Sequence, residues 1–265
     1  MLEIKNIYKT FNPGTINEKQ ALNGVNLTLA DGDFVTVIGG NGAGKSTLLN
    51  MITGAYQVDS GSIIIDGINI TNMPEHKRAK YFGRVFQDPM TGTAATMEIA
   101  ENLALAARRG KRRTLKFGVT HKEKEKYKEM LKVLDLGLEN RLTSKVGLLS
   151  GGQRQAVTLL MATLQNPKLL LLDEHTAALD PKTSAKVLEI SDIIIKSENL
   201  TAMMVTHNMH DAINYGNRLI MMHEGRIILD ISGEEKKKLT VEALLHKFEE
   251  VSGSEFANDK TLLSN

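Results

Sequence analysis

A glycine-rich segment near the start of the sequence carries its clearest chemistry. The segment is Gly39-Gly40-Asn41-Gly42-Ala43-Gly44-Lys45-Ser46, which fits the pattern G-x-x-x-x-G-K-[ST]. In such a loop the backbone N–H groups can turn inward around a chain of phosphates. The pattern therefore predicts a nucleoside triphosphate site, in which Lys45 reaches the β- and γ-phosphates and the Ser46 hydroxyl ligates Mg²⁺.

The segments on either side have the composition needed to position this loop. Residues 34–38 form a β-branched and aromatic run, which is typical of a buried strand. Residues 46–52 predict a helix, and Gly54 fits the position just after its end. The start of that helix would face the phosphates and favour their negative charge. A glycine-rich turn without function is the alternative, but strand, loop and helix follow in the required order.

Two neighbouring acids follow another apolar run. Residues 169–172 are four leucines, typical of a central parallel strand covered on both faces, and Asp173 and Glu174 come directly after them. Carboxylates at the end of a buried strand are unfavourable unless a cation binds there, although a pair of solvated acids is the alternative. We predict that Asp173 holds Mg²⁺ and that Glu174 polarises an attacking water.

A second short glycine motif begins another predicted helix. It is Leu149-Ser150-Gly151-Gly152-Gln153, and residues 151–165 fit a helix that stops before Pro167. Ser150 fits the N-cap position, so a plain capped helix is one interpretation. A capped helix start with two glycines can also be a second anion site.

Taken together, these motifs and His207 resemble the ATP-binding cassette (ABC) family of transport ATPases, over residues 2–230. The resemblance implies an α/β fold, with a P-loop NTPase core, an antiparallel β subdomain and a helical signature subdomain inserted at about 88–166. It implies a single domain over residues 1–250. Residues 251–265 are expected to be a frayed C-terminal tail.

The resemblance also implies roles for residues outside these motifs. His207 would contact the γ-phosphate and position Glu174 and the water. Gln87 would sense Mg²⁺ and the attacking water. Asp180 would lie in a loop that crosses a dimer interface, and it also fits an N-cap that precedes a proline. Phe11 would stack on adenine, with Tyr8 as the alternative, although a core role suits either ring equally well.

The predicted site residues fall into three groups. The catalytic residues are Lys45, Gln87, Glu174 and His207. The nucleotide-binding residues are Phe11, Gly39, Gly40, Asn41, Gly42, Ala43, Gly44, Lys45, Ser46, Thr47, Ser150, Gly151, Gly152, Gln153 and Asp180. The Mg²⁺ ligands are Ser46, Gln87 and Asp173.

The family resemblance implies an activity and a set of partners. The reaction would be hydrolysis of ATP to ADP and phosphate in the nucleotide-binding subunit of a bacterial importer. Two copies would pack head to tail around two ATPs, beside an integral-membrane permease served by a substrate-binding protein. Residues 87–94 and 173–180 are most similar to a subgroup described as amino-acid importers, some of the tryptophan or tyrosine type. A non-transport ATPase of the family, such as an iron–sulfur assembly type, is the alternative.

Composition agrees with this prediction. The 265 residues are 42% hydrophobic, which is enough for a sizeable core. The net charge of +2 provides no electrostatic case for nucleic-acid binding. No apolar run approaches 18 residues, and the first residues do not resemble a signal peptide. We therefore expect a cytoplasmic protein that is peripheral on the inner face of the cell membrane.

Several features stay open at this level. His175 stands where the family commonly has proline, and Ala177 where it commonly has serine, and neither change removes a catalytic group. The basic run 108–116 is either a solvated loop or a contact for anionic lipids or an acidic partner. Residues 236–250 predict an amphipathic helix, and Asp66-Gly67 a hairpin turn.

Overall fold

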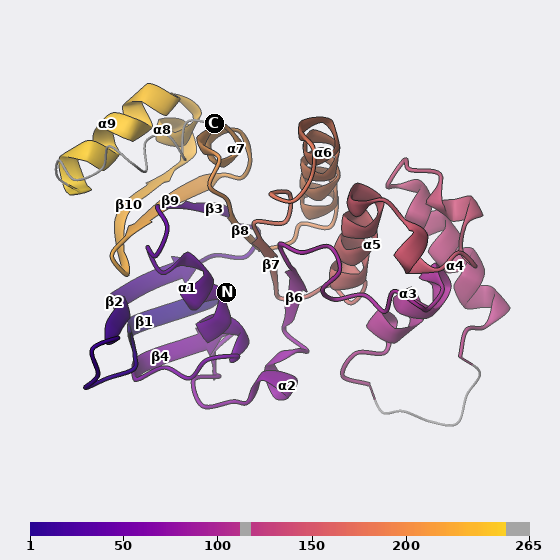
Figure 1. Ribbon diagram of the computed structural model, residues 1–265, viewed down its shortest axis with the longest axis horizontal. Helices are drawn as coiled ribbons and strands as arrows, with labels where there is room; N and C mark the ends of the chain where they lie inside the picture. The colour runs from indigo at the N-terminus through magenta and orange to yellow at the C-terminus, as the bar shows by residue number, and fades with distance from the viewer. Residues whose placement is uncertain (112–117, 253–265) are drawn as a thin grey trace. The chain divides into compact units, whose positions relative to one another are not determined.

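The computed structural model describes residues 1–111 and 118–252, which fall into two units. The first unit joins residues 1–78 to the chain from 201 onward, and the second consists of residues 79–200. Each unit combines strands with helices, as Figure 1 shows, and the predicted α/β class is confirmed.

An antiparallel sheet contains the first strands of the first unit. Its order is β2-β1-β4-β5. The strands are β1 (Leu2–Phe11), β2 (Lys19–Leu29), β4 (Ser60–Ile65) and β5 (Ile68–Asn69). Between β4 and β5, Asp66 and Gly67 have φ angles of 47° and 76°. Positive φ at both central residues is the geometry of a tight hairpin, so the predicted turn is confirmed.

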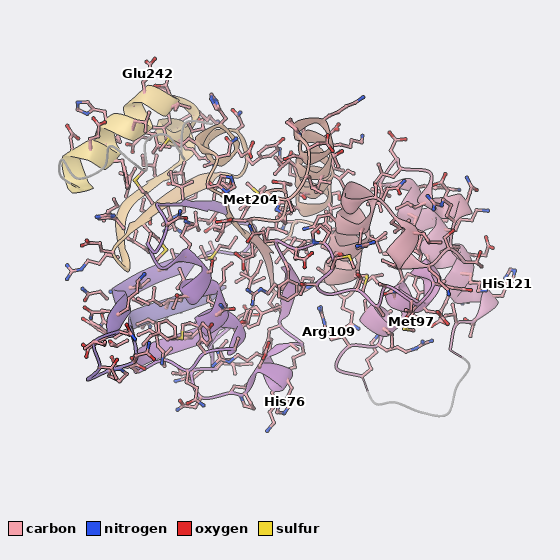
Figure 2. All side chains as sticks on the ribbon, in the orientation of Figure 1. His76, Met97, Arg109, His121, Met204 and Glu242 are labelled. Carbon is pink, nitrogen blue, oxygen red and sulfur yellow. The ribbon has the colours of Figure 1, made fainter. Side chains whose placement is uncertain are left out.

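Another sheet of this unit contains the strand predicted before the glycine-rich loop. Its strands lie in the order β10-β9-β3-β8, and β3 is parallel to both of its neighbours. The strands are β3 (Phe34–Ile38), β8 (Ala202–Val205), β9 (Arg218–His223) and β10 (Arg226–Ser232). Every residue of β3 is buried, and so is Met204 of β8, which Figure 2 shows in the interior of this unit.

Helices accompany both sheets of the first unit. Within the described residues they are α1 (Lys45–Thr53), α2 (Glu75–Arg78), α7 (Met209–Asn214), α8 (Gly233–Lys237) and α9 (Val241–Ser252). The helix predicted over 46–52 is α1. Its C-cap is Gly54, with φ at 85° and an N–H that donates to the carbonyls of Asn50 and Met51, as predicted.

The chain after β10 forms two helices where the sequence predicts one over 236–250. The break lies between α8 and α9, at residues 238–240. The Thr240 hydroxyl accepts from the N–H of Ala243 at 3.2 Å, so a side chain that caps a helix start replaces helix continuation. The apolar face is as predicted. Its buried or partly buried members are Leu239, Val241, Leu244, Leu245 and Phe248. Glu242 points away from this face (Figure 2).

The second unit places helices beside a pair of parallel strands. The strands are β6 (Phe82–Val85) and β7 (Leu169–Asp173). The helices are α3 (Ile99–Ala107), α4 (His121–Lys132), α5 (Gly151–Thr163) and α6 (Pro181–Ser197), with short 3₁₀ turns η1 (Leu138–Asn140) and η2 (Val146–Leu148). The leucines of β7 are all buried, as the apolar run predicts. α5 ends two residues before the predicted end at 165.

Two sequence predictions fall partly outside the described residues. The basic run 108–116 is described only as far as 111, where Arg108 donates to Glu123 at 2.9 Å. The predicted frayed tail over 251–265 lies beyond the described residues, except for the last two residues of α9.

Candidate functional site

The glycine-rich loop lies between β3 and α1, in the order that the sequence predicts. Gly44 is the N-cap of α1, with φ at 100°, and a Cβ there would meet the carbonyl oxygen of Ala21 at 2.5 Å. Only glycine accepts both conditions. No side chain caps α1, and its first turn contains no acidic residue. The start of this helix therefore offers backbone N–H groups and a positive dipole end to an anion.

Lys45 lies inside this loop. Its side chain is only 7% exposed, and Nζ donates to the carbonyls of Gly39 at 2.6 Å and Gly40 at 3.1 Å. Ser46 is exposed and Thr47 is half-buried, one and two residues further along the helix. An ammonium group is thus held at the same loop as the uncapped helix start, which fits the predicted phosphate site.

His207 leaves the sheet beside this loop. It follows β8, which pairs in parallel with β3. The N–H of Thr206 donates to the carbonyl of Val37 at 3.1 Å, so the ends of the two strands are adjacent. His207 is exposed. Because parallel strands end at the same edge of a sheet, the fold brings His207 and the phosphate loop to one edge, as the proposed chemistry requires.

Phe11 ends β1 and is half-buried. Its ring packs edge-on against Tyr56, with centroids 5.3 Å apart and planes at 78°. The Lys9 ammonium lies 5.6 Å from the Phe11 centroid. The alternative ring, Tyr8, is 39% exposed and its hydroxyl lies over Gly24. Tyr56 is a contact that the sequence prediction missed, because only the fold brings residues 11 and 56 together.

Asp173 ends β7 in the second unit and Glu174 directly follows it, so the two acids lie at the end of a buried strand, as predicted. The Asp173 carboxylate accepts from Arg84 Nη2 at 2.8 Å, and both side chains are mostly buried. Arg84 belongs to the neighbouring strand β6, so the parallel pairing explains a partner that the sequence prediction missed. Glu174 has φ at 46°, a left-handed conformation that is uncommon for residues other than glycine.

Gln87 follows β6, the strand beside β7. Val85 pairs with Leu172, so Gln87 and the two acids leave the same edge of the strand pair. Gln87 is exposed. The carbonyl of Phe86 accepts from Gln155 Nε2 of α5 at 2.8 Å. The start of the Gln87 loop is therefore tied to the helix that carries the second glycine motif.

Ser150 is the N-cap of α5, as predicted. Its Oγ accepts from the N–H of Gln153, and Gln153 Oε1 accepts from the N–H of Ser150, both at 3.3 Å. These two reciprocal bonds form a capping box. Gly151 is exposed, whereas Gly152 is buried against Thr183 of α6, where a Cβ would collide with the threonine methyl group. Gly152 thus has a packing role that does not depend on a ligand.

Asp180 caps α6, with Pro181 as its first residue, so the N-cap interpretation is confirmed. Its carboxylate accepts from the N–H of Thr183 at 3.1 Å. Hydrogen bonds from Thr183, first its side chain and then its backbone, lower the pKa of Asp180. Asp180 is exposed and stays ionised beside the helix start.

His175, whose role the sequence leaves open, is 1% exposed. Its Nε2 lies 3.0 Å from Ser191 Oγ of α6. Burial lowers the pKa of His175 to about 4, so the imidazole is neutral at physiological pH.

The candidate site residues are thus divided between the units. The phosphate loop, Phe11 and His207 belong to the first, and the acids, Gln87 and the capped start of α5 to the second. Among the described residues no three His, Cys, Asp or Glu side chains form a metal-binding group.

Comparisons with known proteins agree with this set of motifs. A family model described as "ABC transporter" matches residues 22–177. The chain is 48% identical over 254 residues to the "Tyrosine transport ATP-binding protein" of Clostridioides difficile, a match that covers 94% of this chain and 99% of that protein. It is 35% identical over 236 residues to the "Spermidine/putrescine import ATP-binding protein PotA" of Haemophilus influenzae, which covers 89% of this chain and 59% of PotA.

A solved structure shows the same fold. The dimeric post-hydrolysis state of the ATP-binding cassette MJ0796, bound to ADP and Pi, superposes with a TM-score of 0.74 at 30% identity, over 88% of this chain and 98% of that chain. Within residues 1–111 and 118–252, no helix is both long enough and apolar enough to cross a bilayer. From the family match, the full-length relative and the shared fold, the chain belongs to the ABC transporter family, as one of its ATP-hydrolysing, nucleotide-binding subunits.

Proposed function

We propose that this chain powers a bacterial importer of a small molecule. The observation that carries the proposal is the uncapped start of α1 with the Lys45 ammonium held in the same loop. A helix start left open in this way is suited to a phosphate chain. Support for import comes from the relatives, since the names of two of them describe tyrosine transport and spermidine/putrescine import.

In this proposal the first unit binds the nucleotide. The N–H groups of residues 39–44 and of the start of α1 surround the β- and γ-phosphates, and Lys45 exchanges its loop carbonyls for phosphate oxygens. Phe11 stacks on the adenine, with Tyr56 behind its edge. His207, at the same sheet edge, contacts the γ-phosphate.

The second unit supplies the groups for hydrolysis. Asp173 accepts a hydrogen bond from Arg84, and its carboxylate would be a ligand of Mg²⁺. Ser46 and Gln87 are the other residues that would ligate the ion. The bound ion would neutralise charge that develops on the transferred phosphoryl group. Glu174 accepts a proton from the attacking water as general base, and Gln87 helps to position that water.

Two copies of the chain form the working unit. Ser150, Gly151 and the start of α5 in one copy contact the ATP held by Lys45 of the other, and Asp180 lies at the interface between copies. Support comes from the dimeric state of MJ0796, which has the same fold. The cap on Ser150 already uses the N–H of Gln153, so the serine hydroxyl and the remaining N–H groups would make the contact across the dimer.

The permease would dock on the loop after Gln87, near residues 88–93. Just before this loop, the carbonyl of Phe86 accepts from Gln155 of α5. Within the loop, Met90 contacts the Arg154 guanidinium of the same helix. Movement of the loop would therefore be passed to the capped start of α5. The chain would lie on the inner face of the cell membrane, and the transported molecule would be an amino acid of the tyrosine type, in line with the 48% identical relative.

Co-expression with a candidate permease gene from the same genome tests the importer role. A tagged chain should retain the permease in detergent, and cells should take up labelled tyrosine in a way that Lys45→Ala abolishes. Uptake of spermidine but not of tyrosine would mean that the transported molecule is a polyamine and not an amino acid. Failure to retain any membrane protein, with ATPase activity intact, would reject the importer role in favour of a non-transport ATPase.

Dimer closure has its own test. Glu174→Gln should hold ATP and shift the chain from monomer to dimer, measured by size-exclusion chromatography with light scattering. Adding Ser150→Arg should reopen the dimer, because it places bulk and positive charge at the start of α5. A Glu174→Gln protein that stays monomeric at saturating ATP, with the permease present, would contradict the head-to-tail arrangement.

A further inference from the structure

The turn after β7 places the proposed catalytic carboxylate on a backbone conformation that needs support. Glu174 has φ at 46°. For a residue with a side chain, this left-handed conformation is less stable than the right-handed one by about 1–2 kcal/mol. Such conformations persist where the surrounding structure determines them. The residues next to Glu174 are therefore the place to look for what holds the carboxylate.

His175, the next residue, is anchored in the interior. It is 1% exposed, and its only described hydrogen-bond partner is Ser191, which is also 1% exposed. The Ser191 hydroxyl donates its single hydrogen to the carbonyl of Val187 at 2.8 Å. Since that hydrogen is used, the His175 Nε2–H must be the donor in the 3.0 Å bond to Ser191 Oγ. The histidine is therefore held in one tautomer and one orientation.

The anchor itself is firmly placed. Ser191 lies in the middle of α6, on the face that the second unit buries. α6 starts at Pro181 with the Asp180 cap, which fixes the start of the helix at the end of the 174–180 segment. Within the turn, the N–H of Ala177 donates to the carbonyl of Glu174 at 3.0 Å. The His175 side chain thus links the turn to the core.

We propose that His175 is a positioning residue, whose hydrogen bond to Ser191 holds Glu174 in its left-handed conformation and so directs the carboxylate at the attacking water. The inference rests on the proposed role of Glu174 as general base. It differs from a purely structural role because the effect must pass through the Glu174 carboxylate.

Ser191→Ala removes the acceptor and is the smallest change that tests the link. We expect the rate of ATP hydrolysis per bound nucleotide to fall by about tenfold, with the dissociation constant for ATP changed by less than about twofold, because misplacing a catalytic group affects turnover. Rates are divided by the number of ATP sites titrated in the same sample, which removes any contribution from unfolded protein.

Two further variants provide the controls. Ser197→Ala alters another serine of α6 that donates to a carbonyl of its own helix, that of Ile194 at 3.2 Å, and it should leave turnover unchanged. His175→Gln keeps a neutral N–H donor at a similar reach and should retain at least about a third of the wild-type rate, whereas His175→Leu should behave like Ser191→Ala. Equal rates for the Gln and Leu variants would reject the hydrogen bond as the cause.

A double-mutant cycle with Glu174→Gln separates positioning from general destabilisation. If Ser191 acts through the carboxylate, Ser191→Ala should lower the single-turnover rate about tenfold in the wild-type background and hardly at all in Glu174→Gln. Similar losses in both backgrounds would overturn the proposal. A Glu174→Gln protein with near-normal turnover would instead reject the role of Glu174, and with it the function on which this inference rests.

Discussion

Two strand–turn–helix segments of the molecule are built in opposite ways. In the first unit, β3 leads into α1 through residues 39–44, four of which are glycine. In the second unit, β7 leads into α6 through residues 174–180, which contain no glycine. The first turn leaves the helix start without a side-chain cap, whereas the second closes it with Asp180 and Pro181.

The difference shows what each turn presents. An uncapped helix start with glycine before it offers backbone N–H groups to a ligand. The turn before α6 satisfies its own polar groups through the Asp180 cap and the buried His175–Ser191 bond. The group that this turn presents to a ligand is therefore the Glu174 side chain. The start of α5 follows the second design, because Ser150 and Gln153 cap it reciprocally.

Lys45→Ala tests the open turn most directly and should have the largest effect. ATPase activity should fall by at least about a hundredfold, because preorganised positive charge at the phosphates is lost. Circular dichroism should show an unchanged fold. Lys5→Ala is the matched control, since Lys5 pairs with Glu3 at the surface. Near-normal turnover of folded Lys45→Ala would mean that the open turn is not the nucleotide site.

Lys236 sharpens the comparison, because this buried lysine also donates to backbone carbonyls, those of Tyr215 and Gly216. Burial lowers its pKa to about 8, against 10.5 for the unfolded chain. Between these values the unfolded chain binds a proton that the folded chain releases, so this group adds stability as pH rises. Relative to Lys236→Met, the wild type should gain up to about 3 kcal/mol between pH 8 and pH 10.5.

Urea unfolding at both pH values measures this difference. Lys236→Met should keep its ATPase activity at neutral pH, unlike Lys45→Ala. The carbonyls to which Lys236 donates, those of Tyr215 and Gly216, follow the end of α7 and are not part of the phosphate loop. A difference in the free energy of unfolding that does not change with pH would mean that Lys236 titrates as an ordinary lysine.

The two glycine-containing helix starts should respond differently to alanine. Gly152→Ala should lower the free energy of unfolding by about 1–3 kcal/mol through overpacking on Thr183, and Thr183→Ser should recover most of it by removing the methyl group. In Gly44→Ala the new Cβ would collide with the backbone carbonyl of Ala21, and φ at this position is 100°. Because both problems lie in the backbone, no second side-chain substitution should restore stability. Thermal unfolding of Gly152→Ala, of Gly152→Ala combined with Thr183→Ser, and of Gly44→Ala checks this. Failure of Thr183→Ser to rescue Gly152→Ala would argue that Gly152 has another role.

The smallest expected effect is on the cap of α5. Ser150→Ala should lower the free energy of unfolding by about 1 kcal/mol, and Ser150→Asn should restore it, because asparagine also caps. If Ser150 acts only as a cap, any ATPase activity lost in Ser150→Ala should be recovered, together with stability, in Ser150→Asn. Restored stability without restored activity would support the contact between copies that we propose.

Much of the fold follows from local pattern. The strand 34–38, the helix beginning at residue 45 or 46, the Asp66-Gly67 turn and the caps at Ser150 and Asp180 were all predictable. Each depends on the properties of a few adjacent residues, such as β-branching, positive φ or a short polar side chain. The break at 238–240 was missed, because a cap at Thr240 competes with helix continuation and periodicity does not decide between them.

The sequence by itself determined the phosphate loop, the order of the motifs and the family, because these depend on residue types at fixed spacing. Only the tertiary structure decided the partners that come from distant elements. It paired Asp173 with Arg84 across parallel strands, packed Phe11 against Tyr56, and buried His175 against Ser191. The physical reason is that hydrogen bonding and burial depend on which elements become neighbours in the fold. The number of residues between two positions in the sequence does not show whether their elements will be neighbours.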